Sequence, residues 1–304
     1  MNRIEKINVT IITGFLGAGK TTFINQLLKQ NSETQFALVE NEFGDVAIDT
    51  KLIKGVDASQ MFELKQGCIC CTISDEFELV LQELAEKFPN VKHLLIETTG
   101  IADPSSVIRP FFADSNLKKT YYYNGTVCLV DAVNFKSSPE KEITIKQLVV
   151  ADSVYVSKSE NLSSIQREIF KKALQKINQF AEINFFTIDS WCNIQLDSVI
   201  KKNRTEYDFA GFSYTHSNIS SKTLRINQPL RKGEFIEWLK YTLDIFKNEI
   251  YRTKGMLCFE NEPYEYILQG VGGSFEIVEG EEFIQSETSV IVFIGKEIPL
   301  IQFN

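Results

Sequence analysis

Three cysteines lie within four positions of one another in the stretch KQGCICCTI, residues 65–73. In an extended chain Cys68 and Cys70 point to one side, and a turn after a glycine can bring Cys71 round to join them. Three thiolates are a soft ligand set for Zn²⁺ or another thiophilic divalent ion, and they leave one tetrahedral position open. A redox-active thiol pair and inert packing are the alternatives. We therefore hypothesise an open transition-metal site at this turn.

The stretch GFLGAGKTT, residues 14–22, follows a short β-rich run and leads into a helical pattern. It matches the loop G-x-x-x-x-G-K-[ST], whose amides cradle phosphates while its lysine reaches the β and γ oxygens. Lys20 is thus the expected catalytic lysine, and the Thr21 hydroxyl is an expected Mg²⁺ ligand. The expected nucleotide contacts in this loop are Gly14, Gly17, Ala18, Gly19, Lys20, Thr21 and Thr22.

An apolar run at 93–97 ends in an acidic residue, Glu97, and Gly100 follows three residues later. In P-loop NTPases an acidic residue at such a place holds Mg²⁺, usually through water, and the glycine amide can sense the γ-phosphate. The motif alone is a weak signal. Its place on a buried strand, about 75 residues after the loop, makes Glu97 a candidate for Mg²⁺ binding and catalysis.

The stretch SKSE, residues 157–160, is close to the N-K-x-D motif by which GTPases read guanine. The Glu160 carboxylate can accept the N1 hydrogen and the exocyclic amine of guanine, while the stem of Lys158 lies along the ring. Two positions depart from that motif, because Ser157 replaces a bracing asparagine and Glu160 carries one extra methylene. GTP is the expected nucleotide, and a solvated charge pair is the alternative.

A further acidic cluster, ENEFGDVAID, occupies residues 40–49. A solvated loop is the simplest interpretation of three carboxylates in six positions. Beside a phosphate site they also fit a switch loop that positions water or binds metal only when the γ-phosphate is present. We take Glu42 as a catalytic candidate and Glu40 or Asp45 as an exchangeable fourth ligand for the three thiolates.

Strand and helix patterns predict the elements that position these residues. The β-rich runs are residues 7–13, 36–40, 62–64, 93–97, 126–130 and 153–157. Several are continuously apolar, which is typical of strands covered on both faces. Helical spacing is clearest at 75–88, and the expected core positions there are Phe77, Val80, Leu81, Leu84 and Phe88. The fold class is α/β: a P-loop NTPase with a mostly parallel sheet that binds nucleotide at the carboxyl ends of its strands.

Length and composition predict two domains in a soluble globular protein. With 304 residues and about 150 residues per domain, we expect a P-loop domain at 1–205 and a smaller domain at 206–304. The second contains one helical pattern and several strand patterns, which indicates an α+β domain. A net charge of −8 without a lysine or arginine run argues against nucleic acid or an anionic membrane as partner.

The N-terminal stretch shows no signal peptide pattern, and no run of 18 apolar residues predicts a membrane span. We therefore expect a cytoplasmic protein, where thiols stay reduced and clustered cysteines more often bind metal or do redox work than form disulfides. The isolated Cys128, Cys192 and Cys258 are expected to be packing residues.

Five stretches, GFLGAGKTT, ENEFGDVAID, GCICCT, ETTGIADP and LVDAVNF, closely resemble in order and spacing the CobW-like metal-chaperone GTPases. The likeness covers most of residues 7–160, and the cysteine triplet is its most specific part. The C-terminal segment resembles the small C-terminal domain of that family more loosely. Many relatives carry a histidine-rich stretch, whereas this chain has two histidines, which puts a metal-storage role in doubt.

The resemblance implies a GTPase that binds a transition metal through its cysteine triplet. It assigns the transition metal to Cys68, Cys70 and Cys71, Mg²⁺ to Thr21 and Glu97, and a metal-linked switch to Glu40, Glu42 and Asp45. It also implies that GTP binding and hydrolysis gate metal delivery to a client metalloprotein, sometimes through nucleotide-dependent dimerisation.

The leading function is GTP-driven delivery of a metal, with Zn²⁺ first and cobalt, nickel or iron also compatible with three thiolates. A small-molecule phosphotransferase is the runner-up, although Arg109 is the only arginine between residues 4 and 166 and no arginine-rich lid is evident. A thiol-sensing nucleotide-binding regulator is the third hypothesis. Hydrolysis is expected to be slow without a partner, because no arginine finger can be assigned in cis.

Overall fold

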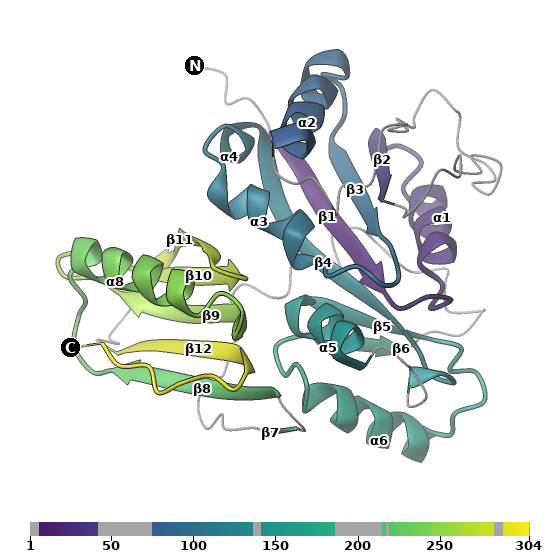
Figure 1. The fold of residues 1–304 in the computed structure, drawn as a ribbon. Helices are drawn as coiled ribbons and strands as arrows, with labels where there is room; N and C mark the ends of the chain where they lie inside the picture. Colours follow the sequence, from purple (N-terminus) through teal and green to yellow (C-terminus); the bar gives the residue numbers. More distant parts are fainter. Residues whose placement is uncertain are drawn as a thin grey trace. The chain divides into compact units, whose positions relative to one another are not determined.

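The computed structural model is shown in Figure 1. It describes residues 6–41, 75–135, 141–185, 215–216, 219–282 and 288–303. The chain divides into two compact units, Met1–Asn203 and Arg204–Asn304. Among the described residues, no helix has the length and apolar character needed to cross a membrane.

In the first unit, the described strands form a six-stranded sheet in the order β2-β3-β1-β4-β5-β6, and every neighbouring pair is parallel (Figure 1). The strands are β1 (Ile7–Gly14), β2 (Phe36–Asn41), β3 (His93–Thr98), β4 (Tyr121–Asp131), β5 (Ser153–Ser157) and β6 (Glu182–Phe185). Since β1 lies between β3 and β4, the loops that follow these three strands meet at one edge of the sheet.

The parallel sheet predicted from the apolar runs is confirmed. The run at 126–130 is the carboxyl half of a longer strand, because β4 begins at Tyr121 and includes three tyrosines that the apolar pattern did not capture. The short strand β6 was not predicted, and the predicted strand at 62–64 lies outside the described residues.

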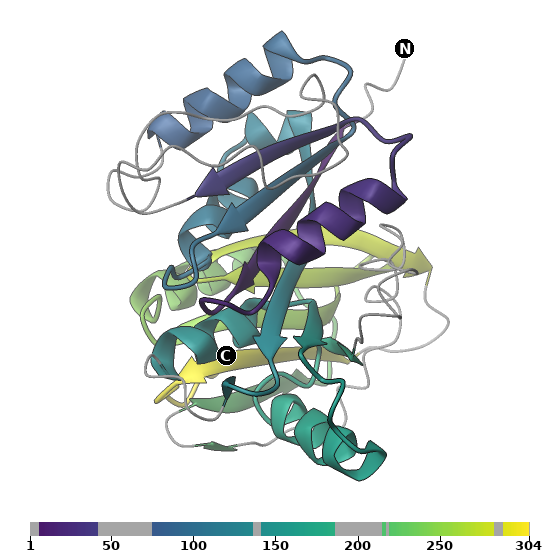
Figure 2. The same cartoon turned by 90° about the vertical axis from the view of Figure 1, so that its right-hand side faces the viewer.

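Helices cover both faces of this sheet, as Figure 2 shows for the first unit. They are α1 (Lys20–Gln30), α2 (Asp75–Lys87), α3 (Ser105–Ala113), α4 (Leu117–Thr120), α5 (Lys141–Val150) and α6 (Ser164–Gln175). Successive residues of β4 point to opposite faces, so Leu129 packs in one core with Phe23 of α1, and Cys128 packs in another with Leu148 of α5. The nucleotide loop therefore rests on a sheet that is buried from both sides.

Helix α2 corrects one predicted core position. Phe77, Leu81 and Leu84 are buried as their spacing predicts, but Phe88 is 36% exposed. Phe88 is the residue after the end of the helix at Lys87, where its backbone N–H still donates to the Leu84 carbonyl oxygen at 2.9 Å but its side chain is only partly covered.

The carboxyl end of α5 is anchored by a buried asparagine, Asn178. Its Nδ2 donates to the carbonyl oxygens of Leu148 at 2.7 Å, Val149 at 3.2 Å and Ala151 at 2.8 Å. Its Oδ1 accepts two further backbone N–H groups. These contacts satisfy carbonyls that a helix end leaves unpaired, so α5 is fixed where the chain passes to β5.

In the second unit, the described strands form an antiparallel sheet in the order β11-β10-β9-β12-β8-β7. Its elements are β7 (Thr215–His216), β8 (Ile219–Ile226), α8 (Lys232–Ile245), β9 (Ile250–Cys258), β10 (Tyr264–Val271), β11 (Ser274–Glu282) and β12 (Ser289–Lys296). This arrangement of one described helix with antiparallel strands is the α+β class expected from the sequence, although β11 was not predicted.

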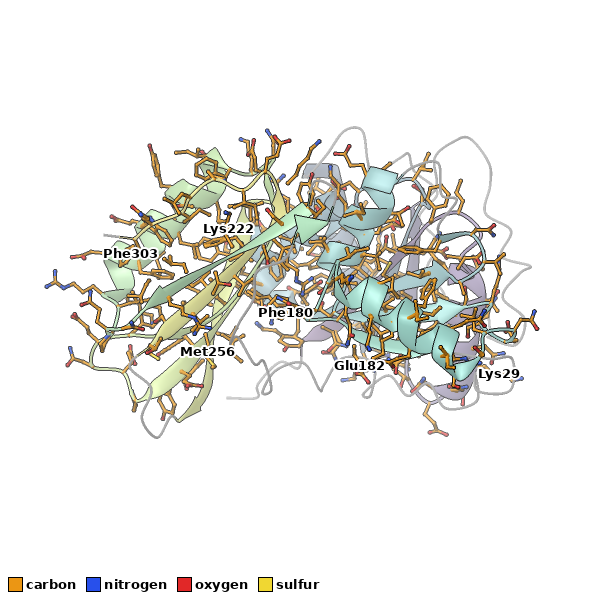
Figure 3. The ribbon with its side chains drawn as sticks, turned by 90° about the horizontal axis from the view of Figure 1, so that it is seen from below. Lys29, Phe180, Glu182, Lys222, Met256 and Phe303 are labelled. Atoms are coloured by element: carbon orange, nitrogen blue, oxygen red, sulfur yellow. The ribbon has the colours of Figure 1, made fainter. Side chains whose placement is uncertain are left out.

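Helix α8 buries an apolar stripe against one face of the second sheet. Phe235, Leu239 and Leu243 follow helical spacing and share a core with strand residues of the sheet. The end of the chain packs on the same helix: the Phe303 ring, labelled in Figure 3, lies 5.1 Å from the Trp238 ring between centroids. The Trp238 Nε1 donates to the Gln302 carbonyl at 3.0 Å.

Candidate nucleotide site

Three glycines of the phosphate loop adopt positive φ angles, and one of them also has no room for a side chain. Gly14, Gly17 and Gly19 have φ angles of 138°, 73° and 94°, a region that glycine occupies without steric cost. A Cβ on Gly14 would lie 2.3 Å from the carbonyl oxygen of Leu129. Helix α1 begins directly after Gly19, so its free N-terminal amides are available to an anion held by the loop.

Lys20 lies against the backbone of its own loop. Its side chain is buried, and its Nζ donates to the carbonyl oxygens of Gly14 at 2.9 Å and Phe15 at 3.5 Å. The ammonium therefore sits in the loop that the sequence assigns to phosphates. Of the neighbouring predicted contacts, Ala18 is buried and Thr22 is exposed.

The two predicted Mg²⁺ ligands lie together. The Thr21 hydroxyl donates to Glu97 Oε1 at 3.4 Å, although the two residues are 76 positions apart in the chain. A hydroxyl and a carboxylate are hard oxygen donors of the kind that Mg²⁺ prefers, usually with water completing the shell. This pair of donors, from the first turn of α1 and the end of β3, thus fits Mg²⁺.

Parallel pairing brings the start of the acidic stretch to the same edge. Glu40 on β2 is in register with Glu97 on β3, and Asn41 is in register with Thr98. The Thr98 hydroxyl in turn donates to the Thr13 hydroxyl at 2.9 Å, which ties β3 to β1 just below the loop. The chain that follows β2 therefore leaves from beside the Thr21–Glu97 pair.

Gly100 packs directly on the phosphate loop. A Cβ at this position would lie 2.5 Å from the backbone nitrogen of Leu16, a distance that no side chain tolerates. Only glycine allows this approach of the two backbones. The position predicted to sense the γ-phosphate is thus in contact with the loop expected to hold that phosphate.

Ser157 joins the end of β5, where the sequence predicts base recognition, to the phosphate loop. Its hydroxyl lies 2.7 Å from the carbonyl oxygen of Ala18 in the phosphate loop and 3.3 Å from that of Val130. The sequence had left it open whether serine could replace the asparagine that usually braces this position. In this chain the shorter side chain reaches the loop, and hydrogen bonding joins the end of β5 to the phosphate site.

Lys158 is held by a carboxylate that the sequence reasoning did not single out as a site residue. Its backbone has φ 54°, an unusual conformation for a residue other than glycine. Its Nζ lies 2.6 Å from Asp131 Oδ2. The other Asp131 oxygen accepts the backbone N–H groups of Val133 at 2.8 Å and Asn134 at 3.1 Å. Lys158 is therefore tied to the end of β4, although its side chain is 49% exposed.

The pKa of Asp131 is lowered from its usual range. Partial burial acts to raise it, but the hydrogen bonds from Lys158, from the Asn134 side chain and from two backbone amides together outweigh burial. Asp131 is therefore a carboxylate at neutral pH. It could have been found from the sequence, because it directly follows the apolar run 126–130 at the carboxyl edge of the sheet.

We expect Asp131→Asn to weaken guanine-nucleotide binding by about threefold to tenfold, because Lys158 loses a charge-assisted hydrogen bond and its stem is no longer fixed along the base. The folded pKa of Asp131 is depressed, so its contribution to stability is present above about pH 4 and is lost as the pH falls through the folded pKa. Urea unfolding at several pH values and fluorescent GDP titration measure both effects.

Asp114→Asn is the matched control for that variant. Asp114 Oδ1 also accepts two backbone N–H groups, from Asn116 at 2.8 Å and Leu117 at 2.6 Å, in an exposed turn away from the nucleotide site. Nucleotide affinity should not change in this control. If the Asp131 variant and the wild type bound GDP with equal affinity, Lys158 would not need Asp131 to contact the nucleotide.

The remaining predicted residues divide into those that the structure describes and those it does not. Glu160 is described and exposed. The backbone of Glu40 is described, but its side chain is not. Five predicted site residues lie outside the described residues: Glu42, Asp45, Cys68, Cys70 and Cys71. Within the described part of the chain, histidine, cysteine, aspartate and glutamate form no group of three or more that could hold a metal ion.

Two isolated cysteines have the properties of packing residues. Burial raises the pKa of the Cys128 thiol to about 12, even though the nearby Lys20 charge acts to lower it. Burial, aided by the Glu265 charge, raises the pKa of Cys258 to about 11. Both thiols stay protonated at neutral pH, so neither is a ready metal ligand or nucleophile. Cys192 lies outside the described residues.

Comparison with known proteins gives matches along both units. Residues 8–185 match the family model described as CobW/HypB/UreG, nucleotide-binding domain, and residues 219–302 match the cobalamin synthesis protein cobW C-terminal domain. The chain is 31% identical to the zinc chaperone YjiA of Escherichia coli (strain K12), across 97% of this chain and 96% of that protein. It is 27% identical to zinc-regulated GTPase metalloprotein activator 1 of Schizosaccharomyces pombe, across 97% of this chain and 84% of that protein. The crystal structure of Zn(II)-bound YjiA GTPase from E. coli matches with a TM-score of 0.68 and 26% identity, covering 98% of this chain and 96% of that one.

Proposed function

The chain belongs to the CobW/HypB/UreG family, and from that premise we propose that it is a GTPase metallochaperone. In this proposal it binds Zn²⁺ through Cys68, Cys70 and Cys71 and delivers the ion to a client metalloprotein. The names of its relatives support zinc as the cargo, since YjiA is a zinc chaperone and the S. pombe relative is a zinc-regulated GTPase. A reducing compartment such as the cytoplasm would keep the three thiols available.

The observation that carries the nucleotide part is the meeting of three separate stretches at one edge of the sheet. The loop that holds Lys20, the Thr21–Glu97 pair and the close approach of Gly100 to Leu16 together reproduce the parts that a P-loop NTPase needs. Ser157 and Lys158 extend the same site toward the base.

In hydrolysis, water attacks the γ-phosphorus of GTP, the bond to the oxygen bridging the β- and γ-phosphates breaks, and GDP and phosphate leave. Lys20 and the loop amides bind the phosphates, and the Gly100 amide faces the γ-phosphate. Thr21 and Glu97 would hold Mg²⁺, which neutralises charge on the β- and γ-oxygens when it is bound. Glu42 is the candidate that positions the attacking water.

Coupling between nucleotide and cargo follows from the order of the chain. Glu40 lies on β2, and Glu42, Asp45 and the three cysteines all lie between the end of β2 and the start of α2. This stretch begins beside Glu97, so a change at the γ-phosphate can alter the positions of the carboxylates that serve as the fourth zinc ligand, Glu40 or Asp45. Nucleotide-dependent dimerisation is a further prediction for the delivery step.

The experiment that tests this proposal is a zinc titration of the reduced protein against a competing chelator without oxygen. It is done once with Mg²⁺ and a nonhydrolysable GTP analogue and once with Mg²⁺ and GDP. We expect the zinc affinity to differ by about tenfold, because coupled sites in proteins commonly differ by about 5- to 150-fold. Zinc should in turn change the ratio of the GTP-analogue and GDP affinities by the same factor, since coupling is reciprocal.

Equal zinc affinities in the two nucleotide states would contradict the chaperone proposal. The cysteines would then be a static or redox site. A phosphotransferase would be revealed by phosphate transfer to a small acceptor, and a thiol sensor by a change of nucleotide affinity on cysteine oxidation without any effect of metal.

A further inference from the structure

A glutamine on α5 connects that helix to the loop after β3. Gln147 has 0% of its surface exposed, and its Nε2 donates to the carbonyl oxygens of Gly100 at 3.1 Å and Ala102 at 3.2 Å. Both partners are acceptors, so the orientation of the amide is determined: a flipped amide would place its oxygen against two carbonyl oxygens. This residue belongs to none of the sequence motifs.

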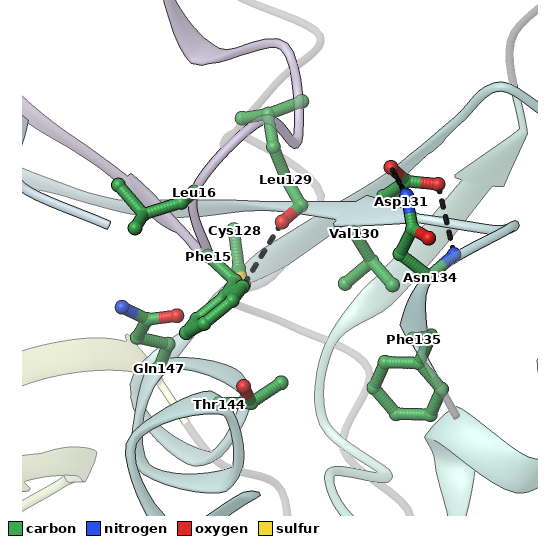
Figure 4. A pocket seen from close by; sticks show the side chains of 10 residues that line it. All are labelled: Phe15, Leu16, Cys128, Leu129, Val130, Asp131, Asn134, Phe135, Thr144 and Gln147. Carbon is green, nitrogen blue, oxygen red and sulfur yellow. Dashed lines mark hydrogen bonds between the residues drawn. The ribbon is translucent and has the colours of Figure 1, made fainter. Parts of the chain in front are cut away.

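The other end of the same amide faces the nucleotide loop. A cavity of about 20 Å³ lies between α5, the end of β4 and the loop residues Phe15 and Leu16. Figure 4 shows Gln147 extending from α5 toward these two residues. Its Oε1 is buried and has no hydrogen-bond partner among the described residues. The cavity has room for about one water molecule. A water molecule there would donate to Oε1, so the amide needs no contact with the nucleotide to be satisfied.

Gly100 is thereby held from two directions. Its Cα packs against the backbone nitrogen of Leu16, and its carbonyl oxygen accepts from Gln147. Because its Cα and its carbonyl oxygen are both held, the φ and ψ angles of Gly100 are restricted, although glycine would otherwise be the most flexible residue of the loop. The direction of the Gly100 amide follows from those angles. Helix α5 is a firm support, because Asn178 fixes its carboxyl end.

We propose that Gln147 is a positioning residue for GTP hydrolysis, which holds the loop 99–102 so that the Gly100 amide is aimed at the γ-phosphate before GTP arrives. The proposal rests on the GTPase function proposed above. Gln147 acts through Gly100 and does not touch the nucleotide. Gln147 should therefore favour the binding of GTP over GDP, because GDP lacks the γ-phosphate that Gly100 senses.

Gln147→Leu tests the proposal, since leucine keeps an apolar volume in the cavity and removes both hydrogen bonds to the loop. We expect affinity for a nonhydrolysable GTP analogue and kcat each to fall about tenfold, as expected for the loss of two neutral hydrogen bonds. Affinity for GDP should stay at the wild-type value, because its phosphates contact only the P-loop. Amide hydrogen exchange at residues 99–103 of the nucleotide-free protein should become faster.

Lys146→Met is the matched control. Lys146 is the neighbouring residue and also joins α5 to this loop, through an ion pair of 3.3 Å with Asp103. That pair is partly exposed, and such pairs contribute little. All measurements on this control should therefore match the wild type within about twofold.

Two outcomes would overturn the proposal: unchanged hydrogen exchange in the loop, or an unchanged ratio of GTP-analogue to GDP affinity, whether neither affinity falls or both fall equally. An equal fall of both affinities would mean that Gln147 supports the fold as a whole, and thermal unfolding would then show a matching loss of stability. Failure of the GTPase function is distinguishable, because it appears as absent hydrolysis by the wild-type protein. The hydrogen-exchange comparison then still decides whether Gln147 holds the loop.

Discussion

Replacing Lys20 by alanine is expected to lower GTP turnover by about 10³-fold, because the side chain supplies a buried positive charge to the γ-phosphate as negative charge develops there. Lys20 is placed for this task by the first turn of α1 and by its bonds to Gly14 and Phe15. Among the described residues, Lys20 is the lysine that the G-x-x-x-x-G-K-[ST] motif places at the phosphates. Phosphate release from GTP, measured with excess Mg²⁺, checks the prediction.

Lys29→Ala provides the control on the same helix. Lys29 lies in the last turn of α1, is exposed and is labelled in Figure 3. Its removal should leave turnover unchanged. Lys20→Arg separates charge from geometry: if turnover stays low with arginine, the site requires the compact ammonium, whose shape differs from the planar guanidinium. Normal hydrolysis by Lys20→Ala would show that the loop is not the catalytic phosphate site.

The sequence was sufficient to predict the layered α/β unit, because both of its signals are local. A glycine loop between a strand and a helix fixes one strand end, and continuously apolar runs identify strands covered on both faces. The rule that ligands bind at the carboxyl ends of parallel strands then placed Thr21 and Glu97 at one edge. In the structure the Thr21 hydroxyl and the Glu97 carboxylate do lie together, 3.4 Å apart.

Contacts that depend on side-chain reach could not be predicted in the same way. Whether the Ser157 hydroxyl spans the gap to Ala18 depends on the separation of β5 from the phosphate loop, which no local pattern encodes. Gln147 could not be identified either, because it lies in a helix with almost no amphipathic pattern. Only the folded structure shows that it donates to the Gly100 carbonyl oxygen. The strand-end rule could have identified Asp131, but not its pairing with Lys158.

The misplaced core position of Phe88 has a different cause. Helical periodicity predicts which face a residue occupies only while the helix continues, and α2 ends at Lys87. The chain then turns at Pro89, which cannot extend the helix. An aromatic residue at this end of the helix is therefore only partly covered.

Replacing Cys68, Cys70 and Cys71 together by serine is expected to lower zinc affinity by about 10³-fold or more, because thiolates supply most of the binding free energy in cysteine-rich zinc sites. Serine keeps the size of each side chain but is a harder and far less acidic ligand. Competition against a chelator is the appropriate measurement, since it separates a tight site from weak surface binding. Cys258→Ala is the control, because this buried thiol has its pKa raised to about 11 and should not contribute.

The same triple variant distinguishes a cargo site from a structural one. The proposed nucleotide contacts lie in the phosphate loop, at the start of α1 and after β3 and β5, and the proposal assigns the three cysteines to zinc alone. On that proposal GTP binding should persist, while the nucleotide should no longer change zinc affinity. If the variant bound zinc as tightly as the wild type, the metal would have to be held elsewhere. If it lost GTP binding as well, the cysteines would support the fold of the switch, and nucleotide would not be gating a cargo.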